Sequence, residues 1–107
     1  MRSARLMVHR CLIDGSELRV RHGTVVVASR GDHNDLDWEA VIDAADDPAV
    51  ELGRNELQLT VIVGVDDAGS VELAELSGEA QVVRYVQSTV VWRGDGALTG
   101  FDRGRLS

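Results

Sequence analysis

The chain lacks several residue types on which other classes of protein depend. Its 107 residues include no lysine, one proline and one cysteine, so no intramolecular disulfide can form. No apolar run approaches the roughly 20 residues of a membrane-spanning helix, and the first residues lack the apolar region of a secretory signal peptide. We therefore expect a cytoplasmic protein, or one assembled within a virion, with no membrane partner.

Aromatic residues are also scarce, at 4% of the chain, so the core has to be built from Val, Leu, Ile and Ala. The largest side chains available to it are Trp38 and Trp92. With 18 acidic residues against 11 arginines, the net charge is −7, which opposes binding to nucleic acid. Basic residues that are all arginine are typical of a GC-rich genome, which favours a bacterial or phage source.

What the sequence does contain is apolar alternation with a period of two. It is clearest over residues 56–63, where Leu57, Leu59, Val61 and Val63 share one face. Turn signals recur about every ten residues, which is typical of antiparallel sheets rather than βαβ units. We predict one all-β, mostly antiparallel domain over residues 1–107, a β-sandwich or small β-barrel of about seven or eight short strands.

Turn residues set the expected strand limits. Asp14-Gly15 predicts a two-residue hairpin with positive φ at both positions, and Gly69 suits a left-handed position in the turn 66–69. His22-Gly23 indicates a break or bulge, and Gly78 is expected to separate two strands.

Two segments are expected to depart from the strand pattern. Residues 47–53 contain the only proline and predict at most one short helix, because Asp47 can cap it, Pro48 suits its first turn and Gly53 suits its end. Residues 102–107 are expected to form a flexible tail, or one that a partner orders.

The stretch 31–40, GDHNDLDWEA, is the first place to look for a ligand site. It gathers acids and a histidine ahead of a tryptophan, and we name Asp32, His33, Asp35 and Trp38 as candidate ligand-binding residues. The stretch fails the EF-hand pattern, because Leu36 and Asp37 stand where that loop needs an oxygen ligand and a glycine. No metal site is predicted, and a solvated turn leading into a strand is the simpler interpretation.

Catalytic chemistry finds little support in the sequence. His33 could act as a base, but Cys11 lies in an apolar run and no serine stands in a G-x-S-x-G context. The three histidines are too far apart for a recognisable zinc motif. The glycines of residues 94–100 lack the lysine of a phosphate-binding loop. No catalytic residue and no cofactor is predicted.

Two residues are candidates for a protein interface. Trp92 is the first candidate, because tryptophan is enriched at protein interfaces. Ile62 makes its strand apolar on both faces, as expected of a central strand or of one covered by a partner.

These observations favour a non-enzymatic structural or protein-interaction module that self-associates or docks on a larger assembly. Residues 76–101, LSGEAQVVRYVQSTVVWRGDGALTGF, are loosely similar to the closing strands of phage tail or capsid-associated proteins, without a motif that assigns a family. The expected partner is a protein or a second copy, rather than nucleic acid or membrane. The alternative is a small-molecule-binding barrel, or a small enzyme, that uses the 31–40 loop.

Overall fold

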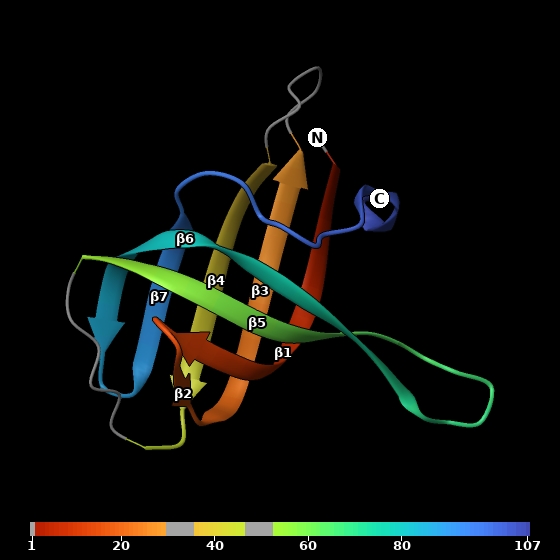
Figure 1. The fold of residues 1–107 in the computed structure, drawn as a ribbon, viewed down its shortest axis with the longest axis horizontal. Coiled ribbons are helices and arrows are strands. Elements are labelled where there is room, and N and C mark those ends of the chain that lie inside the picture. The colour runs from red at the N-terminus through yellow and green to blue at the C-terminus, as the bar shows by residue number, and fades with distance from the viewer. Residues whose placement is uncertain (1, 30–35, 47–52) are drawn as a thin grey trace.

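The computed structural model describes residues 2–29, 36–46 and 53–107, which form seven strands and one turn of 3-10 helix (Figure 1). The strands are β1 (Arg2–Ile13), β2 (Ser16–Leu18), β3 (Val20–Ser29), β4 (Leu36–Ala44), β5 (Arg54–Val65), β6 (Val71–Val86) and β7 (Thr89–Gly94). The 3-10 turn is η1 (Arg103–Arg105). The described ranges contain no helix long and apolar enough to cross a membrane.

All the strand pairings are antiparallel, and the sheet closes into a six-strand barrel. Neighbours around the barrel follow the order β1-β3-β4-β7-β6-β5, and β5 pairs with β1 to complete it. The short β2 adds to the end of β1 outside this ring. The predicted all-β fold is therefore confirmed, and the barrel is the form it takes.

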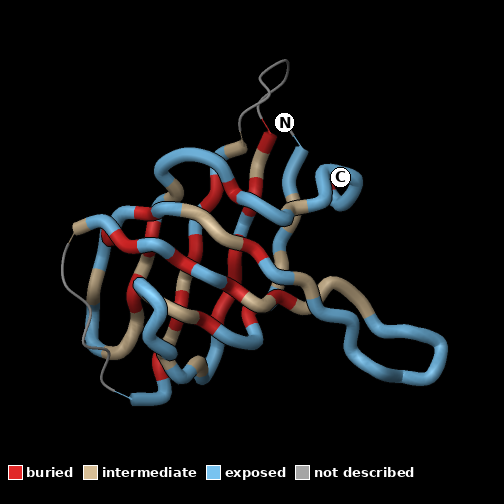
Figure 2. Tube along the Cα trace, in the orientation of Figure 1, coloured by how far each residue is buried: buried red, intermediate tan, exposed pale blue. Residues whose placement is uncertain are grey.

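Alternation along the strands separates a core from an outer surface, as the banded colours of Figure 2 show. In β4, every second residue from Trp38 onward is buried, namely Trp38, Ala40, Ile42 and Ala44. The buried core cluster as a whole consists of Val8, Cys11, Val25, Val27, Trp38, Ala40, Ile42, Leu57, Leu59, Val61, Leu76, Ala80, Val82, Val90, Trp92 and Leu98.

Two of the predicted turns have the left-handed backbone expected of them. Asp14 and Gly15 have φ of 49° and 85° in the β1–β2 hairpin, and Gly69 has φ of 83° between β5 and β6. Next to the expected irregularity at His22-Gly23, the pairing of β3 with β4 shifts register between Val20 and His22. A bulge of this kind bends a strand and helps a narrow sheet to close.

Gly78 does not end a strand, contrary to the prediction. β6 runs through it as one strand of 16 residues. A Cβ at this position would lie 2.7 Å from the carbonyl oxygen of Ala97 and 2.8 Å from Cζ2 of Trp38. The glycine therefore serves close packing of the indole and the closing segment on the strand, rather than a turn.

The C-terminal residues 102–107, expected as a possible tail, lie beside β1 in the structure. Ser3 and Ser107 exchange two backbone hydrogen bonds of 3.2 and 3.1 Å, and Leu106 is buried. Arg105 donates a hydrogen bond of 2.9 Å to the carbonyl of Val63. The predicted helix at 47–53 lies outside the described residues, apart from Gly53.

Strands β5 and β6 continue past the barrel as a two-stranded arm. The pairing of β1 with β5 begins at Met7 and Ile62, whereas β5 and β6 stay paired as far as Val65 and Val71. We call residues 63–72 the arm. It projects at the lower right of Figure 1, and it is largely exposed in Figure 2.

Candidate functional site

The predicted ligand site at 31–40 is only partly described. Asp32, His33 and Asp35 lie outside the described residues. The fourth candidate, Trp38, is buried at the start of β4, and its Nε1 donates a hydrogen bond of 3.2 Å to the carbonyl of Gly96. Its indole therefore closes the end of the barrel, and in this position it presents little surface to a ligand.

A pocket of about 420 Å³ lies next to this end of the barrel. Its lining includes Leu36, Asp37, Ala97, Leu98, Phe101 and Arg103. Two of these residues, Leu36 and Asp37, belong to the 31–40 stretch. The lining combines three larger apolar residues, Leu36, Leu98 and Phe101, with an acid and an arginine.

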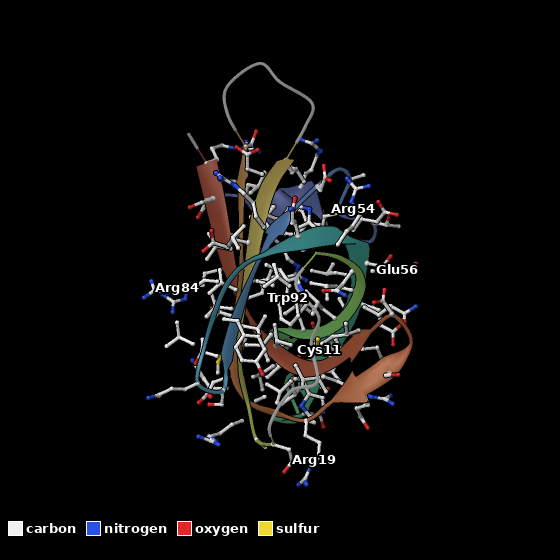
Figure 3. All side chains as sticks on the ribbon, turned by 90° about the vertical axis from the view of Figure 1, so that its left-hand side faces the viewer. Cys11, Arg19, Arg54, Glu56, Arg84 and Trp92 are labelled. Atoms are coloured by element: carbon white, nitrogen blue, oxygen red, sulfur yellow. The ribbon has the colours of Figure 1, made fainter. Side chains whose placement is uncertain are left out.

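Trp92, the first of the two interface candidates, lies inside the barrel, as Figure 3 shows. Its Nε1 donates a hydrogen bond of 3.0 Å to Oδ1 of Asn55. Asn55 in turn donates from Nδ2 to Oδ2 of Asp14 at 3.0 Å. Because the indole is fully buried in its own core, Trp92 does not face a partner.

Asp14 completes this chain at the surface. Its Oδ1 accepts a hydrogen bond of 2.8 Å from the backbone N–H of Glu56. That backbone bond, followed by the bond from Asn55, lowers the pKa of Asp14 below its ordinary value of 3.8, because both stabilise the charged carboxylate. The turn between β1 and β2 is thus attached to the start of β5.

The cysteine and the possible metal ligands were the remaining candidates for chemistry. Cys11 is buried among apolar side chains, and desolvation raises the pKa of its thiol to about 12. Within residues 2–29, 36–46 and 53–107, no three His, Cys, Asp or Glu side chains are grouped so that they could hold a metal ion.

The second interface candidate, Ile62, lies on the outside of the barrel in a row of three apolar residues. Its neighbours Leu59 and Val61 face the core in alternation, so Ile62 points outward. It is directly opposite Met7 of β1 and Leu73 of β6. Met7 is 51% exposed and Leu73 is 50% exposed, which is unusual for such large apolar side chains.

The apolar surface continues onto the arm. Val65 and Val71 are directly opposite each other and are 65% and 52% exposed. Val71 lies two residues from Leu73 on β6, so the two side chains share a face. A register shift between Ile62 and Gly64 keeps Val65 on this same face.

On the barrel side of the row, the surface becomes polar. The next position on each strand places Arg10 of β1 and Glu75 of β6 on either side of Thr60 of β5. Here the surface is hollowed by a depression of about 270 Å³, whose wall includes Thr99 of the closing segment. We call the surface of β1, β5 and β6 formed by these residues the outer face: Met7, Arg10, Thr60, Ile62, Val65, Val71, Leu73 and Glu75.

Sequence reasoning identified one residue of the outer face, Ile62, and missed the others. Ile62 could be identified because its strand is apolar on both faces. The segments around Met7 and Leu73 show the same pattern less clearly. Only the register shows that these residues lie side by side. Distant segments of the chain therefore combine into one patch that no single segment indicates.

No profile of a known protein family, no curated protein and no solved structure matches this chain significantly.

Proposed function

We propose that the protein is a non-enzymatic interaction module that docks on another protein surface through its outer face. The observation that carries this proposal is the continuous apolar surface from Met7 through Ile62 and Leu73 to Val65 and Val71. Four of these residues are at least half exposed and lie on paired strands. Contiguous exposed apolar surface of this kind marks binding sites in soluble proteins.

The arm gives a second physical argument. Two strands alone are marginally stable in water, and a third strand or a packed face is normally needed to hold them. Beyond Ile62 and Leu73, β1 no longer accompanies β5 and β6. A partner that covers Val65 and Val71 would provide the missing packing.

The surroundings of the apolar surface are those of an interface. Interfaces have an apolar centre and a polar rim. Here Arg10, Thr60 and Glu75 border the apolar row on one side. The charges needed for orientation are therefore present, and they do not interrupt the apolar centre.

The test is photo-crosslinking in the cells that naturally make the chain. A benzophenone amino acid replaces Leu73 on the outer face, and in a matched variant it replaces Val83, which is 55% exposed on the other half of β6. We expect a specific protein adduct from position 73 and none from position 83. Equal labelling from both positions, or no adduct from position 73, would overturn the proposal.

A small-molecule-binding barrel is the second candidate, and the pocket of about 420 Å³ beside Leu36 and Asp37 favours it. A fragment library screened by ligand-observed NMR tests this candidate. The Ala97→Leu variant, which fills part of the pocket, is the control. Fragments that bind the wild-type chain and not the variant would support it, and equal binding to both would contradict it.

A further inference from the structure

The charges of the outer face are arranged antisymmetrically about its central strand. Arg10 lies on β1, Glu75 lies on β6, and both are opposite Thr60 of β5. The next row is symmetric and apolar, with Met7 and Leu73 on either side of Ile62. A surface that is positive on one side and negative on the other is complementary to itself after a rotation that exchanges the two sides.

We infer that the partner of the outer face is a second copy of this chain, packed face to face about a two-fold axis that runs along β5. This inference rests on the proposed function and names its partner. The rotation lays β1 of one copy over β6 of the other. Ile62 then meets the partner's Ile62, Met7 meets the partner's Leu73, and Arg10 meets the partner's Glu75.

The ion pairs across this interface are new ones, since the two charges do not satisfy each other within one copy. Arg10 and Glu75 are separated by a whole strand, about 10 Å at the usual strand spacing. Arg10 uses its Nε to donate a hydrogen bond of 2.8 Å to Glu17. Its two terminal amino groups remain for a second carboxylate, in the forked geometry that arginine favours.

The alternative two-fold axis, across the strands, is unfavourable. It would stack β6 on the partner's β6 and bring the row of Glu75 over the row of Val65 and Val71. Each carboxylate would then lie against valine without a counter-charge, which is costly. The axis along β5 instead matches apolar rows with apolar rows, and it suits the nearly aligned packing that two sheets prefer.

Sedimentation equilibrium of the purified chain tests this arrangement by charge reversal. We expect a concentration-dependent dimer in the wild type. Arg10→Glu and Glu75→Arg should each raise the dimer Kd at least tenfold, because each places like charges in contact. The double variant should restore the Kd to within about threefold of the wild-type value, because it re-forms both ion pairs with their signs exchanged.

Matched controls exclude a general effect of charge or of folding. Arg19→Glu changes the net charge equally and also removes an exposed ion pair, with Asp46, but lies away from the outer face. Glu39→Arg, at an exposed position of β4 on the opposite side of the barrel from β5, is the control for the acidic position. Both controls should leave the Kd unchanged, and circular dichroism should show the same fold in all variants.

A second measurement places the axis itself. The inferred axis passes through Ile62, so Ile62→Cys should be joined to its own copy by a short bismaleimide. Val83→Cys, on the other half of β6, should not. Cys11 does not compete, because it is buried and its thiol pKa is raised to about 12.

The outcomes separate this inference from the proposed function. A wild-type chain that stays monomeric, or a double charge variant that fails to restore the dimer, overturns the two-fold packing. If position 73 still forms an adduct with a different protein in cells, the proposed function stands without it. If position 73 forms no adduct and the chain stays monomeric, both are wrong.

Discussion

The indole nitrogen of Trp92 donates a hydrogen bond of 3.0 Å to Oδ1 of Asn55, and this bond joins the barrel core to its surface turn. Asn55 in turn donates a hydrogen bond of 3.0 Å from its Nδ2 to Oδ2 of Asp14. The described part of the structure contains no buried side-chain nitrogen or oxygen without a hydrogen-bond partner. The buried indole N–H of Trp92 thus finds its acceptor at Asn55, the second residue of β5.

Removing the amide of Asn55 should destabilise the fold by about 2 kcal/mol, because it leaves the buried N–H of Trp92 unpaired. Trp92→Phe removes the donor and also creates a cavity, so on its own it should cost about 3 kcal/mol. Urea denaturation of Asn55→Ala, Trp92→Phe and the double variant forms a thermodynamic cycle. We expect the double variant to lose at least about 1 kcal/mol less than the sum of the single losses. Strict additivity would mean that the two side chains do not interact in solution.

The lowered pKa of Asp14 predicts how stability changes in acid. The fold favours the carboxylate, so Asp14 stabilises the native state above its ordinary pKa of 3.8. That contribution is lost as the pH falls below 3.8 and through the lower native pKa. Asp14→Asn should therefore be less stable than the wild type at neutral pH, and the difference should shrink in acid.

The measurement is the free energy of unfolding from urea curves across this acid range. Asparagine tolerates the positive φ of 49° at this position, so the substitution keeps the turn. Asp67→Asn, in the exposed β5–β6 turn, is the control and should follow the wild-type pH dependence. A wild-type slope for Asp14→Asn would show that the two hydrogen bonds do not persist in solution.

The turns and the strand faces could be predicted from the sequence because they depend on local chemistry. Asp14-Gly15 fixes its hairpin through backbone φ, and the alternation from Leu57 to Val61 fixes which side chains face inward. The prediction that a strand ends at Gly78 was wrong, because glycine occurs both in turns and where another group packs closely on the backbone. Only the three-dimensional structure distinguishes the two cases, because it shows Trp38 and the carbonyl of Ala97 packed against Gly78.

The candidate site was less predictable, because it is made by pairing rather than by a motif. Ile62 could be singled out from its own strand, but its contacts with Met7 and Leu73 depend on which strands are neighbours. The pairing of β5 with β1, which closes the barrel, depends on long-range packing, and the periodicity of the sequence does not reveal it. The sequence left Trp92 open between the core and an interface, and in the structure it is buried inside the barrel on β7.

Trp38 packs so closely on Gly94 that any side chain there would collide with the indole ring. Gly94→Ala should therefore destabilise the protein by about 2 kcal/mol through overpacking. The smaller ring of Trp38→Phe should recover part of that loss in the double variant. Thermal unfolding of the four proteins checks this, with Gly96→Ala as a contrast, because it strains the backbone at φ 114° without meeting any atom. Failure of Trp38→Phe to relieve Gly94→Ala would contradict the contact.

The thiol of Cys11 provides a probe of whether the barrel stays closed. It lies opposite Leu59 inside the barrel, and burial raises its pKa to about 12, so at mildly alkaline pH it is neutral and inaccessible. A disulfide reagent such as DTNB should label the native protein only as fast as the barrel opens. Labelling should become immediate in concentrated urea, where the unfolded thiol is exposed. Asn55→Ala should accelerate labelling of the folded protein if the connection from Trp92 holds the barrel shut, whereas Asp67→Asn should not. Labelling of the wild type as fast as a free thiol would mean that the strands around Cys11 separate readily, and closure of β5 on β1 would then be wrong.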